Sequence, residues 1–236
     1  MASNRSRRAL ADKRPYLVLS VVAAFAYYYL RASDLPELYL IPIKGSAVAF
    51  LALYAFLRHG STSARLLAGA LVAASIGDML VEIDLRYGAG AFFVYHCAAI
   101  VMFLRHRGPP LDGADSVVFL ALLLGTPFLS YFFPYDPNLQ WPVAIYALAL
   151  GAMAAGAWAS DFPRWRVGAG AVLFVLSDLL IFAGLGPLSG SPIPEYLVWP
   201  IYYLGMFLIT VGVVTTLRKR DPELSVLQGG RRETLH

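Results

Sequence analysis

The chain has 236 residues, of which 58% are hydrophobic and only 14% are charged, with a formal net charge of +4. A water-soluble domain carries roughly 25% charged residues, so this composition and the mean hydropathy of +0.62 exclude an ordinary soluble protein. A single cysteine excludes a disulfide-rich fold. We expect the lipid bilayer as a partner and no nucleic acid, because the basic residues lie in short groups between apolar segments.

Eight segments are long and apolar enough to cross a bilayer, which requires about 20 residues per helix. In chain order they cover residues 15–31, 36–57, 64–83, 88–104, 115–133, 138–159, 165–186 and 195–217. The first follows a basic stretch, but no A-x-A-type cleavage site follows it, so we expect a retained helix rather than a signal peptide. The sequence therefore predicts an all-α polytopic membrane protein. Its predicted parts are a basic tail over 1–14, an eight-helix transmembrane domain over 15–217 and a basic tail over 218–236.

The distribution of positive charge predicts the orientation, since cytoplasmic loops are enriched in Lys and Arg. If the eight spans alternate in direction, all 19 Lys and Arg residues except Arg31, Lys44 and Arg86 fall on the side of the N-terminus. We therefore expect an integral, multi-pass protein with both termini in the cytoplasm.

Two spans contain a similar segment. The third includes Gly77-Asp78-Met-Leu, and the seventh includes Ser177-Asp178-Leu-Leu. Each of these spans is followed by one with a polar pair, which is Tyr95-His96 in the fourth and Tyr202-Tyr203 in the eighth. We predict two parallel four-helix repeats related by an axis along the membrane normal. The alternative is a chance match of a short pattern.

Ionisable side chains inside spans cost about 2.5 kcal/mol or more at the helix centre, so they mark either a functional site or a structural pair. With a rise of 1.5 Å per residue, Lys44, Asp78, Asp178 and Tyr202 are expected at one depth in the outer half, with His96 slightly deeper. This layer indicates acid–base chemistry. The structural alternatives are an ion pair between Lys44 and an aspartate, a core histidine, and tyrosines that only pack.

Further polar residues lie near this layer. Glu82 is one turn beyond Asp78 on the same helix face, and Asp84 follows it; the favoured interpretation of both is a solvated helix end, where Arg86 can neutralise either one. Ser177 can bond to its own helix. Motifs such as G-x-S-x-G and H-E-x-x-H are absent. We expect no cofactor, and a metal bound by His96 and the two aspartates is the alternative.

The order and spacing of these residues resemble the YhhN-type family of eight-span membrane proteins, which includes the lysoplasmalogenases. The similarity covers roughly residues 36–217. The family pattern is matched by Lys44, Gly77-Asp78, His96, Ser177-Asp178 and Tyr202-Tyr203.

Three positions depart from the family pattern. Gly45 follows the lysine where the family tends to have proline, Ala99 stands where a tyrosine often follows the histidine, and Met206 stands where a glutamine often follows the tyrosine pair. The acid, imidazole and lysine positions are retained, so these departures affect the expected substrate more than the expected fold.

The resemblance implies hydrolysis of the vinyl ether bond of a lysoplasmalogen, a lysophospholipid, to a fatty aldehyde and a glycerophospho-base. Such a bond is cleaved by protonation of its outer alkene carbon and addition of water to the resulting oxocarbenium ion. This requires a protonated acid and an anion, which two carboxyl groups in different environments supply. The predicted catalytic residues are Asp78, Asp178 and His96, and the predicted substrate-binding residues are Lys44, Tyr202, Tyr203, Glu82 and Ser177.

The sequence leaves the roles of the two aspartates open. Burial raises the pKa of a carboxyl group and a neighbouring cation lowers it. Our hypothesis is therefore that the aspartate farther from Lys44 is the general acid. The nearer one then stays ionised and stabilises the cation or activates water.

Two other classes of function use the same features. A parallel repeat with intramembrane acids also describes a proton-coupled transporter of small molecules or lipids. Transporters of this kind typically have helices that are interrupted near mid-depth. Pro142 and Pro200 lie close to helix starts instead, which argues against a transporter. A receptor or scaffold that uses the polar residues only for helix specificity is the third possibility.

Overall fold

The protein is described by a computed structural model that covers residues 14–220, and over this range every regular element is helical. Residues 1–13 and 221–236 are not described. The predicted basic tails therefore lie mostly outside the described range. The elements are α2 (Arg14–Leu30), α3 (Glu37–Arg58), α4 (Thr62–Val81), α5 (Leu85–Arg105), α6 (Gly113–Leu120), η1 (Ala121–Gly125), α7 (Thr126–Phe132), α8 (Pro137–Trp158), η2 (Arg164–Gly168), α9 (Ala169–Gly184) and α10 (Ile193–Lys219).

Each predicted span coincides with one helical segment. The elements α6, η1 and α7 form a continuous segment over Gly113–Phe132, and η2 continues into α9 over Arg164–Gly184. The largest difference from the predicted boundaries is at α5, which begins at Leu85 rather than at residue 88. Within the described range, 7 helices are long and apolar enough to cross a membrane, and the apolar part of α2, Pro15–Leu30, is shorter.

Short polar side chains begin several of these helices. Ser61 accepts a hydrogen bond from the Ala64 amide at 3.2 Å at the start of α4, and Asp84 accepts one from the Arg86 amide at 2.8 Å at the start of α5. Asp136 caps α8 in the same way, with Pro137 at the first helical position. Such caps bond amides that have no partner in the first turn, and they define where these helices begin.

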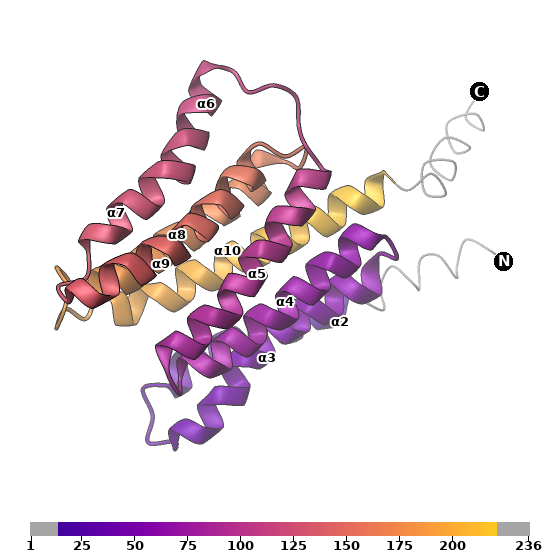
Figure 1. Cartoon of the computed structure of the whole chain (residues 1–236). Helices are drawn as coiled ribbons and strands as arrows, with labels where there is room; N and C mark the ends of the chain where they lie inside the picture. The colour runs from indigo at the N-terminus through magenta and orange to yellow at the C-terminus, as the bar shows by residue number, and fades with distance from the viewer. Residues whose placement is uncertain (1–13, 221–236) are drawn as a thin grey trace, which may run out of the picture.

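The helices form one bundle with α10 between two groups. Figure 1 shows α2–α5 on one side and α6–α9 on the other. The helix α10 packs against α9 and also against α3 and α4. The start of α2 and the end of α10 lie at the same end of the bundle (Figure 1).

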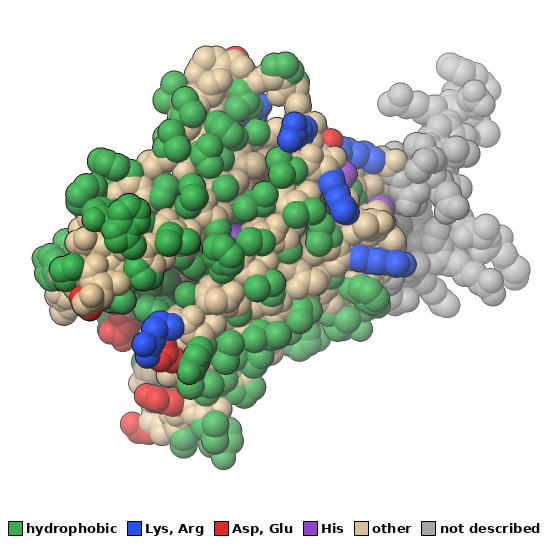
Figure 2. Space-filling model, in the orientation of Figure 1, with side chains coloured by type: hydrophobic (Ala, Val, Ile, Leu, Met, Phe, Trp, Pro, Cys, Tyr) green, Lys and Arg blue, Asp and Glu red, His purple; other side chains and the backbone are tan. Residues whose placement is uncertain are grey.

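Charged side chains divide between the two ends of the bundle. Figure 2 shows most of the Lys and Arg side chains at the end where α10 finishes and most of the acidic side chains at the opposite end. We call these the basic end and the acidic end. The basic end carries Arg58, Arg65, Arg105, Arg107, Arg164, Arg166, Arg218, Lys219 and Arg220, and the acidic end carries Asp34, Glu37, Glu82, Asp84, Asp136 and Glu195, together with Arg31 and Arg86.

Small residues set the closest helix contacts. A Cβ atom on Gly170 would lie 2.7 Å from the carbonyl oxygen of Gly205, and one on Gly205 would lie 2.6 Å from that of Gly170. These distances leave no room for a side chain, so α9 and α10 touch through their backbones. Between α3 and α4, Ser75 donates a hydrogen bond to the Gly45 carbonyl at 2.7 Å. The polar segments of α4 and α9 are thereby fixed against α3 and α10.

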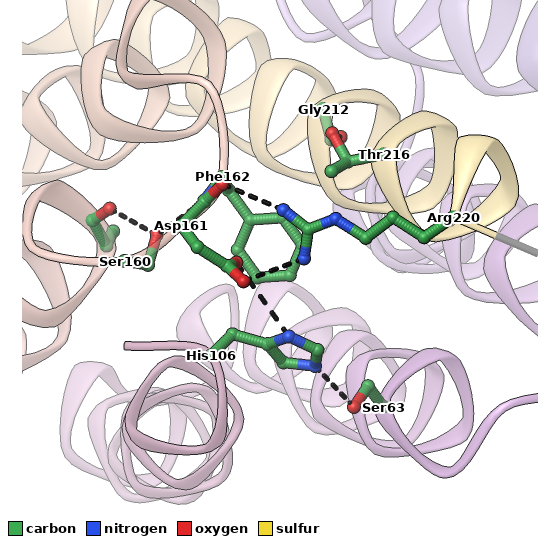
Figure 3. Close-up of polar contacts among 9 residues, drawn as sticks. Ser63, His106, Ser160, Asp161, Phe162, Gly212, Thr216 and Arg220 are labelled. Carbon is green, nitrogen blue, oxygen red and sulfur yellow. Dashed lines mark hydrogen bonds and ion pairs between the residues drawn. The ribbon is translucent and has the colours of Figure 1, made fainter. Parts of the chain in front are cut away.

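A polar cluster joins four segments at the basic end (Figure 3). Its members are Ser63, His106, Asp161 and Arg220, which we call the basic-end cluster. Arg220 donates to the Asp161 carboxylate at 2.8 Å and to its carbonyl at 2.9 Å. His106 lies 2.8 Å from the Ser63 hydroxyl and 3.8 Å from the Asp161 carboxylate. The cluster therefore ties the end of α10 to the loop after α8, the end of α5 and the start of α4.

Candidate active site

A cavity of about 410 Å³ lies between α4, α5, α8, α9 and α10 in the half of the bundle toward the acidic end. Its apolar walls come from Val81, Leu85, Ala89, Phe92, Leu139, Pro142, Val143, Ile181, Phe182, Leu185, Val198 and Trp199. Its polar and charged residues are Lys44, Asp78, Asp84, Arg86, Tyr146, Ser177, Asp178 and Tyr202. The volume is in the range of about 300–1,000 Å³ that is typical of small-molecule sites.

The cavity reaches the surface at the acidic end. Arg86, one of its lining residues, has a side chain that is 84% exposed. Figure 2 shows a hollow at this end of the molecule, bordered by basic and acidic side chains. An amphipathic ligand can therefore keep a charged group at the mouth while an apolar chain lies among the helices.

Asp78 and Asp178, the two predicted catalytic aspartates, both line this cavity. Each is buried in the wall, with 2% of Asp78 and 5% of Asp178 exposed. The Tyr202 hydroxyl donates to Asp78 Oδ2 at 2.9 Å, and the Tyr146 hydroxyl donates to Asp178 Oδ2 at 2.8 Å. The structure thus gives each carboxyl group one tyrosine partner and access to one shared space.

The charged surroundings of the two aspartates differ. Lys44 lines the cavity together with Asp78 and pairs with Glu82, which lies one turn after Asp78 at the end of α4. Within residues 14–220, neither aspartate forms an ion pair of its own. Asp78 is therefore the aspartate on the side of Lys44.

Lys44 pairs with Glu82 rather than with an aspartate. The Lys44 Nζ atom lies 2.5 Å from Glu82 Oε1, and the same oxygen accepts a hydrogen bond from the Tyr27 hydroxyl at 2.9 Å. The ammonium group also lies over the rings of Tyr27, at 5.2 Å, and Trp199, at 5.7 Å. Glu82 is therefore a half-buried ion-pair partner.

The second acid of this segment, Asp84, belongs to the mouth of the cavity. Its carboxylate pairs with the Arg86 guanidinium at 2.9 Å. The hydrogen bonds from Arg86 hold the pKa of the Asp84 carboxyl below its ordinary value. The cavity mouth thus carries one fixed anion and one exposed cation.

His96 lies behind the cavity wall and is not among the residues that line it. Its ring is fully buried, and its Nε2 atom lies 3.1 Å from the Tyr146 hydroxyl. Because Tyr146 also bonds to Asp178, the imidazole is connected to the aspartate through a single side chain.

The remaining predicted residues differ in position. Ser177 lines the cavity, but its hydroxyl donates to the Val198 carbonyl at 3.3 Å. Tyr203 does not line it; its hydroxyl lies 2.7 Å from Ser20 Oγ, and it faces an aromatic groove between α2 and α10. The cavity thus includes Lys44, Asp78, Asp178, Ser177 and Tyr202, whereas His96, Glu82 and Tyr203 lie outside it.

Sequence reasoning missed Tyr146 and Trp199. Tyr146 is the only hydroxyl-bearing side chain of α8. It follows Leu139, Pro142 and Val143 at the spacing of one helix face, and that pattern is a signal that could have found it. Trp199 donates to the Ala24 carbonyl at 3.0 Å and separates the cavity from the aromatic groove. No comparable pattern marks its position.

The arrangement of acids does not resemble a metal centre. Within residues 14–220, no group of three or more His, Cys, Asp or Glu side chains is placed to hold a metal ion. His96 faces Tyr146 rather than the two aspartates. The polar partners of the two aspartates are therefore phenols.

Comparison with known proteins gives a family match over most of the chain. The family model described as the YhhN family matches residues 39–213. Two curated relatives, each named lysoplasmalogenase, come from Mycobacterium bovis and Mycobacterium tuberculosis. Each is 30% identical over 179 residues, which is 72% of this chain and 68% of the relative. No solved structure is significantly similar to the chain.

Proposed function

The chain belongs to the YhhN family, and from that premise we propose that it is an integral membrane hydrolase that cleaves the vinyl ether bond of lysoplasmalogens. The products are a fatty aldehyde and a glycerophospho-base. The observation that carries the proposal is that Asp78 and Asp178, from α4 and α9, are both buried and line a single cavity. The relatives named lysoplasmalogenase support the choice of substrate.

The reaction begins with proton transfer to carbon. Asp178 gives its carboxyl proton to the alkene carbon that is not bonded to oxygen, and the electron pair of the double bond forms the new C–H bond. An oxocarbenium ion and the Asp178 carboxylate remain. Water then adds to the cationic carbon and gives one proton to the Asp78 carboxylate, which produces a hemiacetal.

Collapse of the hemiacetal restores the site. Its hydroxyl proton returns to Asp178, and Asp78 gives its proton to the departing ether oxygen. One water is consumed, an aldehyde and an alcohol are released, and both carboxyl groups regain their starting protonation. This cycle needs no covalent intermediate, in keeping with a site of carboxyl groups and phenols.

The surroundings support this division of roles. A buried carboxyl group without a neighbouring cation is suited to carry a proton, and one beside a cation is suited to stay ionised. The Lys44–Glu82 ion pair lies one turn after Asp78 on α4, whereas the polar partner of Asp178 is the Tyr146 phenol. Asp178 is therefore the proposed acid, and Asp78 the proposed base.

The substrate is proposed to lie with its head group at the mouth beside Arg86 and its chain among the apolar walls. Tyr202, bonded to Asp78, positions the attacking water or the ether oxygen. Ser177 lies on the same wall. Lys44 lies beside the site and pairs with Glu82. Tyr203 supports the wall indirectly, through its stacked contact with Trp199 at 6.1 Å.

The finer topology is part of the proposal. We include α2 as an eighth span, with both termini on the cytoplasmic side, because the basic residues gather at the end where α10 finishes (Figure 2). The cavity then opens toward the opposite face of the membrane. The positions of Asp78 and Asp178, in helices that run in the same direction, support two parallel four-helix repeats.

The proposal is tested with the purified full chain and a lysoplasmalogen in D₂O. Protonation of the alkene carbon by an exchangeable group places one deuterium on the carbon next to the aldehyde, which mass spectrometry detects. The variants Asp78→Asn and Asp178→Asn should lower aldehyde release by about 10²- to 10⁴-fold, the usual contribution of general acid–base catalysis. Asp34→Asn, which changes an exposed acid at the same end, is the matched control. Full turnover in both aspartate variants, or an aldehyde without deuterium, contradicts the mechanism.

A further inference from the structure

Tyr146 is the side chain through which α5 and α9 are joined at the site. Its hydroxyl lies 2.8 Å from Asp178 Oδ2 and 3.1 Å from His96 Nε2. It also lines the cavity. One phenol from α8 therefore holds the proposed acid and contacts the buried imidazole.

His96 has no other polar contact within the described chain. Its Nδ1 atom is buried without a hydrogen-bond partner there. Three aromatic rings enclose the imidazole, those of Tyr95 at 5.4 Å, Phe174 at 5.1 Å and Tyr146 at 5.4 Å. The histidine is therefore held in one orientation, with its Nε2 atom directed at Tyr146.

The direction of these bonds follows from the proposed function, in which Asp178 carries its proton on Oδ1 and Oδ2 therefore accepts. A tyrosine hydroxyl has one hydrogen to donate, and here it goes to Asp178 Oδ2. The contact with His96 must then run from Nε2–H to the phenol oxygen. This series of hydrogen bonds uses Asp178 Oδ2, and Oδ1 has no hydrogen bond within the described residues. Asp178 lines the cavity, so Oδ1 is the oxygen left for a substrate.

We propose that Tyr146 is a positioning residue that directs Oδ1 of Asp178 toward the substrate, and that His96 acts on the reaction only through Tyr146. The inference rests on the proposed function, in which Asp178 delivers a proton to carbon. Such a transfer depends on the direction of one O–H bond, and small misplacements of a reacting group reduce rates strongly. A carboxyl group held at Oδ2 by a phenol, itself held by a histidine, cannot rotate without breaking that chain.

The site contains its own comparison. Asp78 is held by Tyr202 in the same manner, at 2.9 Å, but among residues 14–220 no histidine bonds to that phenol. The proposed base, which accepts a proton from mobile water, has the simpler support. The proposed acid, Asp178, is held by two side chains in series, Tyr146 and His96. This difference agrees with a stricter requirement for orientation at Asp178.

The first test separates positioning from binding. In Tyr146→Phe we expect kcat for aldehyde release to fall about 10- to 100-fold, the usual range for loss of an orienting partner. The KM, and the Kd for a saturated alkyl-ether lysolipid that cannot be hydrolysed, should change less than about twofold. Tyr95→Phe removes a hydroxyl that has no partner within the described chain and lies beside the same histidine. It should keep the parent kcat.

The second test asks whether His96 acts through Tyr146. His96→Gln keeps an N–H donor at about the reach of Nε2 and should retain most of kcat, whereas His96→Asn is too short and should match Tyr146→Phe. In the double variant Tyr146→Phe/His96→Asn, kcat should equal that of Tyr146→Phe alone, since the two residues then act in series.

The outcomes distinguish this inference from the proposed function. Unchanged kcat in Tyr146→Phe, a proportional loss of binding affinity, or additive losses in the double variant overturn the inference while Asp178→Asn remains inactive. Full activity in Asp178→Asn overturns the proposed mechanism itself. Tyr146→Phe and His96→Gln are small changes, so their results test the inference even if His96→Asn does not fold.

Discussion

An aspartate, a histidine and a hydroxyl group occur together at two levels of this bundle, and the first of these is the basic-end cluster. There, His106 contacts Ser63 and Asp161 directly, and the Asp161 carboxylate is neutralised by Arg220 at 2.8 Å (Figure 3). The side chain of Asp161 is 32% exposed. These bonds connect three helix ends to the loop after α8, so the cluster serves to hold the bundle together.

The second group has the same residue types but a different arrangement. His96 reaches Asp178 only through Tyr146, Asp178 has no ion pair within the described chain, and the carboxyl group lines a cavity. The comparison teaches that residue type does not distinguish a structural cluster from a reactive one. The absence of a paired cation beside the acid and the presence of adjacent space make the difference.

The largest expected effect comes from giving Asp178 the cation that Asp161 already has. Ile181 lies one turn after Asp178 on α9 and lines the same cavity. In Ile181→Lys, an ammonium beside the carboxyl group should pair with it as a carboxylate, so that the acid has no proton to transfer. We expect aldehyde release to fall by about 10²-fold or more.

Ile181→Gln is the control for size and polarity, and it should keep activity within about threefold of the parent. Thermal unfolding of both variants checks that the bundle is intact. Equal activities of the Lys and Gln variants would show that the charge beside Asp178 is unimportant.

A smaller effect is expected at the ion pair near Asp78. Lys44→Gln removes the cation of the ion pair beside Asp78 and leaves the half-buried Glu82 with only its hydrogen bond from Tyr27. The kcat/KM should fall about tenfold, equivalent to about 1.4 kcal/mol. Lys44→Arg keeps the charge and should lose less. If Lys44→Gln lowers the melting temperature but leaves kcat/KM unchanged, the pair is only structural.

The sequence contained most of the information on the helices and their depth. Eight apolar segments predicted the eight helical segments of the described chain, and the rise per residue predicted one layer for Lys44, Asp78, Asp178 and Tyr202, all of which line the cavity. Both inferences use properties that change along a single helix axis. They do not depend on which face of each helix meets its neighbours.

Rotation about the helix axes was not available from the sequence. Tyr202 and Tyr203 are consecutive and therefore point about 100° apart on α10, so only one of them faces the cavity, and the pattern did not say which. The partner of Lys44 proved to be Glu82 instead of an aspartate for the same reason. Tyr146 was missed because its contacts with His96 and Asp178 depend on α8 facing both α5 and α9.

At the basic end the expected effect is on stability rather than on catalysis. Arg220→Gln removes the ion pair with Asp161 and its second hydrogen bond to the backbone. Both side chains are partly exposed, so the loss of unfolding free energy should be about 1 kcal/mol or less. The kcat and KM should stay within about twofold of the parent. A large loss of activity in a protein that melts normally would contradict the separation of the two clusters.

The smallest expected effect is at the Asp84–Arg86 pair. Its two residues are neighbours in the sequence and exposed, whereas Asp161 and Arg220 are far apart in the sequence. Bonds from Arg86 lower the pKa of Asp84 in the folded protein. Its stabilising contribution is therefore present above about pH 4, the ordinary value for aspartate, and is lost as the pH falls through the folded value.

Asp84→Asn removes this charge but keeps a good helix cap, since asparagine also accepts a bond from the first-turn amides. The variant should melt slightly below the parent at neutral pH, and the two should converge as the medium becomes more acidic than about pH 4. Melting temperatures between about pH 3 and pH 7 measure the difference. A difference that persists at the acidic limit would mean that the cap, rather than the charge, had been damaged.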